Sequence, residues 1–150
     1  MAVTLPEAYT VGAAVLLRDS VGNLQKGVIA KRTATQVTAK FGTVQRRFLA
    51  SWSTISTGML VEYGSADSRH GARLMLADSP EAEHSREALA RKLFDQRFSK
   101  AAEAVAKRGR TMADVKALQA LLPAWVEREL EDAARAAEAE AELRAKYGDL

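Results

Sequence analysis

The chain has 150 residues, of which 47% are hydrophobic and 27% are charged, so it can build one or two small folded domains. It contains no cysteine, which excludes disulfide cross-links, thiolate nucleophiles and cysteine-rich zinc sites. No apolar run approaches the roughly 18 residues that a membrane helix needs, and the N-terminal segment lacks the layout of a signal peptide. We therefore expect a cytoplasmic protein without membrane contact.

The net charge is +3, but the charges are unevenly distributed along the chain. Residues 1–50 contain seven basic and two acidic residues, whereas residues 111–150 contain five basic and nine acidic residues. A basic front half is typical of proteins that bind a polyanion. The same asymmetry also arises where the two ends of a chain attract each other within or between molecules, and both interpretations stay open.

Short strand patterns joined by turn residues fill roughly the first 60 residues. Residues 35–41 alternate strictly between apolar and polar side chains, which is the period of a half-buried strand. Residues 19–23 form a turn cluster, and the Ser- and Thr-rich segment 51–58 is predicted to be irregular. The predicted strands cover residues 13–18, 24–31, 35–41, 44–50 and 59–63.

Four or five short strands within about 55 residues are too few for a wide sandwich, whereas closing them into a small barrel removes their exposed edges. We therefore predict an α+β fold, with a small β-barrel over residues 8–63, a junction at 64–78 and a helical region of two to three helices at 79–150. Within the junction, residues 72–77 either add a strand or pack under the helices. The residues expected to fill the barrel are Val15, Leu17, Val28, Ala30, Val37, Ala39 and Phe48.

From Ser79 the apolar side chains recur at intervals of three and four residues, which is the helical period. Ser79 is a suitable N-cap, and the proline and glutamate that follow it favour the first turn of a helix. No further glycine or proline occurs until Gly109, so the pattern predicts a helix over residues 80–108.

A second helix is predicted to start at Thr111, which is spaced from Asp114 as in a capping box. Pro123 is expected to break or kink the chain there, because proline lacks the backbone N–H and crowds the preceding turn. A third, alanine-rich helix is then expected to run to Tyr147.

No arrangement of residues typical of an active site is present. The two histidines, His70 and His84, are expected in a polar loop and on the first turn of a helix, where a solvated side chain is usual. The sequence has no glycine-rich phosphate loop, no HExxH motif and no GxSxG motif. We expect no catalysis, no metal site, no cofactor and no small-molecule substrate.

Basic residues cluster on three of the predicted strands and their turns. On one rim of a barrel they would follow a phosphate backbone through charge contacts and counterion release. Phe41, Trp52 and Tyr63 would add stacking surfaces wherever they are exposed. The alternative is that the charges only keep a small β protein soluble and protect its edges. The candidate nucleic-acid-binding residues are Lys26, Lys31, Arg32, Lys40, Arg46 and Arg47.

The helical region offers a second candidate surface, for a protein partner or for self-association, which would suit a homodimer that scaffolds or inhibits a complex. Its apolar core closes either within one chain, with Gly109 and Arg110 at the bend, or between two chains. The thin alanine face of residues 133–147 favours a partner such as a second copy. The candidate interface residues are Phe94, Phe98, Leu122, Trp125 and Leu130.

Four short motifs follow one another along the predicted barrel: Val11-Gly12 with Val15, Gly27-Val28, Thr35-Gln36-Val37 and Arg47-Phe48. Their order resembles the SH3-like small barrels of the KOW and Tudor kind, especially those in accessory proteins of tailed bacteriophages, whose closing strand often contains an Arg-Phe step. The resemblance covers residues 8–63 and implies a non-enzymatic barrel that binds nucleic acid or a protein in a nucleoprotein complex. A Tudor-type cage would need clustered aromatic residues, for which the candidates are Tyr9, Phe41, Phe48, Trp52 and Tyr63.

Overall fold

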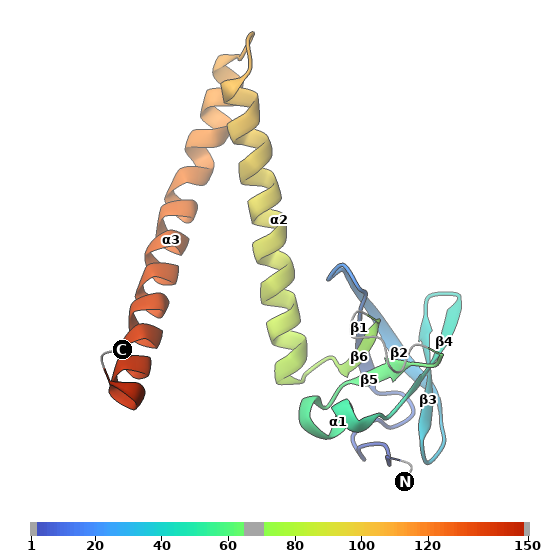
Figure 1. Ribbon diagram of the computed structural model, residues 1–150. Coiled ribbons are helices and arrows are strands. Elements are labelled where there is room, and N and C mark those ends of the chain that lie inside the picture. Colours follow the sequence, from blue (N-terminus) through green and yellow to red (C-terminus); the bar gives the residue numbers. More distant parts are fainter. Residues whose placement is uncertain (1–2, 65–70, 149–150) are drawn as a thin grey trace. The chain divides into compact units, whose positions relative to one another are not determined.

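The computed structural model describes residues 3–64 and 71–148 of the chain. The chain divides into two compact units, Met1–Lys92 and Leu93–Leu150. The first unit contains every strand of the described residues, and the second consists of helix and one turn. Strands therefore precede the two long helices, as the sequence predicts, and the α+β layout is confirmed (Figure 1).

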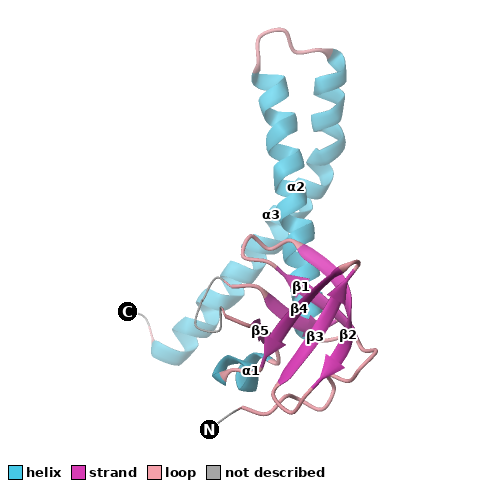
Figure 2. Cartoon of the chain, turned by 90° about the vertical axis from the view of Figure 1, so that its right-hand side faces the viewer, coloured by secondary structure: helices cyan, strands magenta, loops and turns pink. Residues whose placement is uncertain are grey.

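The described strands form a closed antiparallel barrel, consistent with a small SH3-like barrel. Each strand pairs with its neighbours in the sequence, and the last strand returns to pair with the first. Figure 2 shows the strands in magenta, wrapped around a common interior. The strands are β1 (Ala14–Arg18), β2 (Leu24–Arg32), β3 (Gln36–Phe41), β4 (Val44–Leu49), β5 (Leu60–Glu62) and β6 (Arg73–Leu76).

Closure of the barrel depends on β6, which lies in the segment 64–78 that was expected to be a junction. The barrel thus extends past the predicted limit at residue 63. Leu74 of β6 belongs to the barrel core, whereas the next residue, Met75, is buried on the opposite face against Ala82 of helix α2 (Pro80–Ala106). Because both faces are covered, β6 lacks the alternation that identifies the other strands.

Five of the seven predicted core residues are buried in the barrel, and the other two are not. Val28 is 47% exposed and Ala30 is half-buried, while Ile29 between them is buried. A bulge between Ile29 and Lys31 shifts the register of β2 against β3. A bulge adds one unpaired residue, so side chains before and after it do not follow a single alternation. The unbroken alternation assumed from the sequence therefore selects Val28 and Ala30 for the core in place of Ile29. The confirmed core residues are Val15, Leu17, Val37, Ala39 and Phe48.

A short helix, α1 (Trp52–Thr57), occupies the segment that was predicted to be irregular. The Thr54 hydroxyl accepts a hydrogen bond from the backbone N–H of Ser51 at 2.9 Å and donates to the Met59 carbonyl at 2.8 Å. Gly58 then ends the helix in the left-handed region with φ of 70°. The same Ser and Thr residues that suggested a loop therefore cap a helical turn and a half.

The first turns of α2 pack on the barrel within the first unit. Ser79 caps the helix by accepting a hydrogen bond from the Ala82 N–H at 3.2 Å, as the sequence predicts. Ala82 is fully buried and contacts Leu16 and Met75 in a second apolar cluster. This cluster explains why Leu16 is buried although it faces away from the barrel interior.

The second unit is an antiparallel helical hairpin formed by the rest of α2 and by α3 (Met112–Tyr147), with Gly109 in the turn (Figure 1). The rings of Phe98 and Trp125 stack at 5.3 Å between centroids, and Phe94 lies 6.4 Å from Phe98. Part of the predicted helical core therefore closes within one chain.

The break considered at Pro123 does not occur, because α3 continues through this residue, and the described part of the region after the barrel has two long helices, the lower of the predicted numbers. Proline removes the hydrogen bond that would reach the carbonyl of residue 119, and that part of α3 is exposed, so water can satisfy the carbonyl. Trp125, two residues after Pro123, stacks on Phe98 of α2, and Leu121, two residues before it, is half-buried.

Candidate nucleic-acid interface

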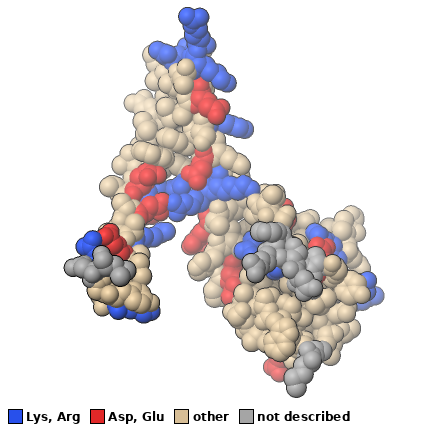
Figure 3. Space-filling view, viewed as in Figure 1, with Lys and Arg blue, Asp and Glu red and all other residues tan. Residues whose placement is uncertain are grey.

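The predicted basic residues lie on three adjacent strands that contain no acidic residue. Lys26, Lys31 and Arg32 belong to β2, Lys40 belongs to β3, and the remaining two belong to β4. Figure 3 shows Lys and Arg side chains in blue over the barrel as well as at the turn between the long helices. Whether the strand residues form one surface depends on which face of the sheet each one occupies.

A row of register partners crosses the barrel from β2 to the end of β5. Lys31 pairs with Thr38 of β3, and Thr38 pairs with Arg47 of β4. The backbone N–H of Tyr63 donates to the Arg47 carbonyl at 2.9 Å, which extends the row by one segment. Lys31, Arg47 and Tyr63 are exposed, so the row lies on the outer face of the barrel.

Two further lysines extend this face along the strands. Lys40 is exposed and pairs with the exposed Val28, while Lys26 is exposed two residues before Val28 on β2. Positions two residues apart on a strand share a face, about 6.6 Å apart. We call the four side chains the outer basic face, which consists of Lys26, Lys31, Lys40 and Arg47.

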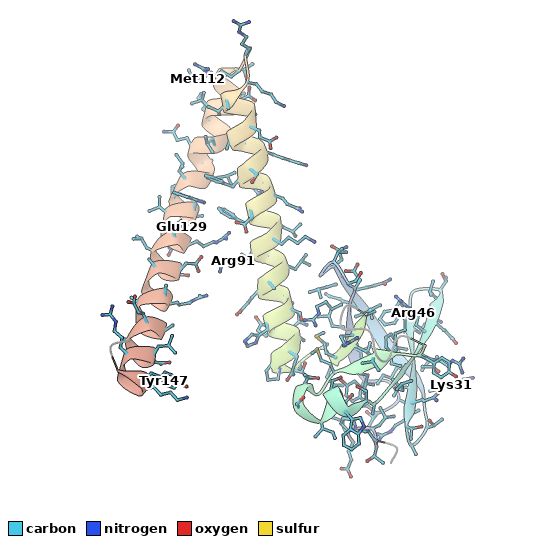
Figure 4. The ribbon with its side chains drawn as sticks, viewed as in Figure 1. Lys31, Arg46, Arg91, Met112, Glu129 and Tyr147 are labelled. Atoms are coloured by element: carbon cyan, nitrogen blue, oxygen red, sulfur yellow. The ribbon has the colours of Figure 1, made fainter. Side chains whose placement is uncertain are left out.

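Arg46 lies on the opposite face of β4 from Arg47. It pairs in register with the fully buried Ala39, and its guanidinium donates two hydrogen bonds of 2.7 Å to the Glu62 carboxylate. The side chains of Arg46 and Glu62 are only 34% and 26% exposed. This fork-to-fork ion pair neutralises Arg46, so its charge adds little to the potential outside the barrel. Figure 4 labels Arg46 and Lys31.

Arg32 also has a structural contact. Its Nη1 donates a hydrogen bond to the backbone carbonyl of Glu7 at 3.0 Å, and it pairs in register with the buried Val37. The side chain thereby ties the N-terminal segment to the end of β2. Of the six predicted residues, four thus share one exposed face, and Arg32 and Arg46 do not belong to it.

The aromatic residues divide into core and surface. Tyr9, Phe41 and Phe48 are buried, which removes Phe41 as a stacking surface and leaves no aromatic cage among the five candidates. Tyr63 is 53% exposed and Trp52 is 71% exposed. The guanidinium carbon of Arg47 lies 4.5 Å from the centroid of the Tyr63 ring, so a cation and an aromatic face are already joined on the outer face.

The sequence does not predict two features of this site. The first is the contact between Arg47 and Tyr63, which depends on the long-range pairing of β4 and β5. The second is the role of Glu62 as the partner of Arg46. The sequence does signal the inward position of Arg46, because Arg46 is two residues from the core residue Phe48 and so shares its face, but it does not identify Glu62 as the partner.

The structure also bears on metal binding, on one of the two histidines and on membrane-spanning helices. Among them there is no group of three or more His, Asp or Glu side chains that could hold a metal ion. His84 is exposed in the first turns of α2, with Nδ1 3.0 Å from the Pro80 carbonyl oxygen, and His70 lies outside the described residues. No helix in the described ranges is both long and apolar enough to cross a membrane.

The predicted partner-interface residues also divide into two groups. Phe94, Phe98 and Trp125 pack within the hairpin, whereas Leu122 and Leu130 are 39% and 68% exposed.

Comparison with known proteins returns no relative: no family model, no curated protein and no solved structure matches the chain.

Proposed function

We propose that the chain is a non-enzymatic nucleic-acid-binding protein that contacts the phosphate backbone with its outer basic face. The observation that supports this function is the distribution of charge on β2, β3 and β4. Lys26, Lys31, Lys40 and Arg47 project from one exposed face, and these three strands contain no Asp or Glu to neutralise them. Such a face attracts phosphates through charge contacts and counterion release.

The Arg47–Tyr63 pair favours nucleic acid over other polyanions. Arg47 covers one part of the Tyr63 ring, and the ring is still 53% exposed. An exposed ring beside a cation offers a base a stacking surface next to a phosphate contact. The finer proposal, which follows the resemblance to KOW- and Tudor-type barrels, is an accessory role in a nucleoprotein complex such as that of a tailed bacteriophage.

The proposal is tested by titrating the full chain into fluorescent single-stranded DNA and RNA of about 16 nucleotides and measuring anisotropy. The triple variant Lys31→Ala, Lys40→Ala, Arg47→Ala removes three of the four charges. Because each lost phosphate contact lowers the slope of log K against log salt by about 0.7, we expect the slope to fall by about two between 50 and 200 mM salt.

The matched control removes the same number of positive charges from the helical hairpin. Arg97→Ala, Lys100→Ala, Lys107→Ala changes three exposed residues and gives the same net charge. Its affinity should remain within about threefold of the unaltered chain, since these residues contact no phosphate under this proposal. Absence of binding by the unaltered chain at low salt, or equal losses in both variants, would overturn the proposed function.

A further inference from the structure

Helix α3 has an exposed apolar stripe that its contacts with α2 leave uncovered. The face packed against α2 contains Leu118, Leu121 and Trp125, each at least half-buried. A second face contains apolar and small residues, interrupted only by Gln119, at intervals of three and four, which places them along one side of the helix over about 39 Å. This α3 stripe consists of Val115, Gln119, Leu122, Val126, Leu130, Ala133, Ala137 and Ala141, all of them exposed.

The exposure is large for the bulky members of the stripe. Leu130 is 68% exposed, Val126 is 46% exposed and Leu122 is 39% exposed. Side chains of this size gain about 1.5–3 kcal/mol each when they are fully buried. A continuous line of them on one helix is typical of an interaction surface rather than of scattered surface residues.

We infer that the stripe is covered by the same stripe of a second copy of this chain, with the two α3 helices antiparallel. Counted from either end of the stripe, the intervals between its residues place each position at the same distance to within one residue. When Val126 faces Leu130 of the other copy, each remaining stripe position also faces a stripe position. The layers are Val115 with Ala141, Gln119 with Ala137, Leu122 with Ala133, and Val126 with Leu130, each present twice.

The sizes of the side chains favour this direction over the parallel one. In the antiparallel pair, three of the four layers place a larger side chain against an alanine, and the fourth places Val126 against Leu130. A parallel pair would set alanine against alanine at 133, 137 and 141 and leucine against leucine at 122. Close packing requires that large and small residues alternate across an interface, because voids lose contacts.

Charge at the ends of the stripe fits the same arrangement. Lys116 flanks the stripe near the start of α3, and Glu138 flanks it on the same side near the other end; both are exposed. In the antiparallel register, Lys116 of each copy lies opposite Glu138 of the other, which gives two attractive pairs. The two copies of Glu127 approach each other near the centre, and salt screens this repulsion. The apolar stripe supplies the attraction, and the end charges select the direction.

Sedimentation velocity over a range of chain concentrations tests the association. Leu130→Glu places a charge in both central layers and is expected to weaken dimerisation at least about 100-fold. Leu143→Glu is the matched control, because Leu143 is a 58% exposed leucine of α3 outside the stripe. It should change the dimer constant by no more than about threefold. A concentration-independent monomer, or an equal loss in both variants, would contradict the inference.

Cysteine cross-linking tests the direction, since the chain has no cysteine of its own. Leu122→Cys and Ala133→Cys are prepared separately, mixed and oxidised. The antiparallel pair should yield the mixed disulfide dimer, because these two positions form one layer. Dimers formed mainly by each variant with itself would show parallel helices and overturn the proposed arrangement. Helicity measured by circular dichroism reports whether each variant remains folded, and none of the changed residues is buried.

Discussion

The guanidinium of Arg46 is held by the Glu62 carboxylate through two hydrogen bonds of 2.7 Å, while the next residue, Arg47, lies over the Tyr63 ring on the other face of the same strand. The two consecutive arginines therefore have different roles, one in the packing of the barrel and one on its outer surface. The first joins β4 to β5 on the inner face, and the second contributes charge to the outer basic face. This division can be measured with single substitutions.

Arg46→Met should lower the free energy of unfolding by about 1 kcal/mol, after allowing for the partial exposure of the ion pair, and leave nucleic-acid affinity nearly unchanged. Arg47→Met should do the reverse, weakening binding and lowering its salt dependence with little change in stability. Urea unfolding followed by circular dichroism and anisotropy titrations provide the two measurements. Equal effects of the two variants on binding would show that both arginines contact phosphate.

Gly27→Ala should destabilise the barrel by about 2 kcal/mol. A Cβ atom at this position would lie 2.5 Å from two ring carbons of Phe41 and 2.8 Å from the Lys40 carbonyl oxygen. The ring of Phe41 thus packs directly on the β2 backbone, where only glycine fits. Phe41→Leu should cost stability alone, and the double variant should cost less than the sum of the two single changes, because the smaller side chain relieves the clash. Strict additivity in urea unfolding would refute this packing account.

Tyr9→Phe should destabilise the chain by about 1–2 kcal/mol. The buried Tyr9 hydroxyl donates to the Gly58 carbonyl at 2.6 Å and lies 3.3 Å from the Leu74 carbonyl oxygen, so it joins the N-terminal segment to the end of α1 and to β6. Tyr63→Phe is the control, since Tyr63 is 53% exposed, and its unfolding curve should not move. An unchanged midpoint for Tyr9→Phe would mean that these carbonyls find other donors.

Alkaline pH offers a second measurement on Tyr9. Burial, and then the nearby charge of Glu81, raise the pKa of Tyr9 far above its usual value of 10.0. A raised pKa in the folded state favours the protonated phenol, so this contribution to stability is complete below pH 10 and is lost as the pH rises further. The unaltered chain should therefore lose more stability above pH 10 than Tyr9→Phe does. Parallel pH profiles for the two chains would exclude this effect.

Arg128→Met should leave the helical hairpin as stable as before or stabilise it by about 1 kcal/mol. Arg128 donates from Nη2 to Asp95 at 2.8 Å, but its buried Nε and Nη1 have no hydrogen-bond partner. Methionine keeps the packing over Phe94 and removes the two unsatisfied donors, and the released Asp95 side chain is 56% exposed to water. A lower midpoint in thermal unfolding would show that the Asp95 contact outweighs the cost of burying the guanidinium.

The sequence predicts much of the fold, because most elements have one covered face. The alternation at residues 35–41 and the helical period after Ser79 both identify an element and its buried side. The prediction is wrong where tertiary contacts change that pattern. The bulge after Ile29 exchanges the faces of β2, and α3 continues through Pro123, with Trp125 stacked on Phe98 of α2. For residues 72–77 the sequence leaves open whether they add a strand or pack under the helices, because both faces of β6 are covered and the alternation that would decide is absent.

At the candidate site too, the sequence predicts what local spacing determines and does not predict what long-range pairing determines. The basic residues are visible in the sequence, and alternation along β4 separates Arg46 from Arg47. The sequence does not reveal that Glu62 binds Arg46 or that Tyr63 lies beside Arg47, because both contacts depend on the pairing of β4 with β5. Partners set by local spacing can be predicted, whereas partners set by the closure of the barrel require the structure.

The late position of β6 has a consequence for folding during synthesis. Until Arg73–Leu76 leave the ribosome, β1 and β5 have no strand on one side, and each presents a row of unpaired backbone donors and acceptors. A chain stopped at Tyr63 would keep both edges open permanently and would be prone to aggregate through them. Fragments intended to isolate the β unit should therefore extend through the first turns of α2, which cover Met75.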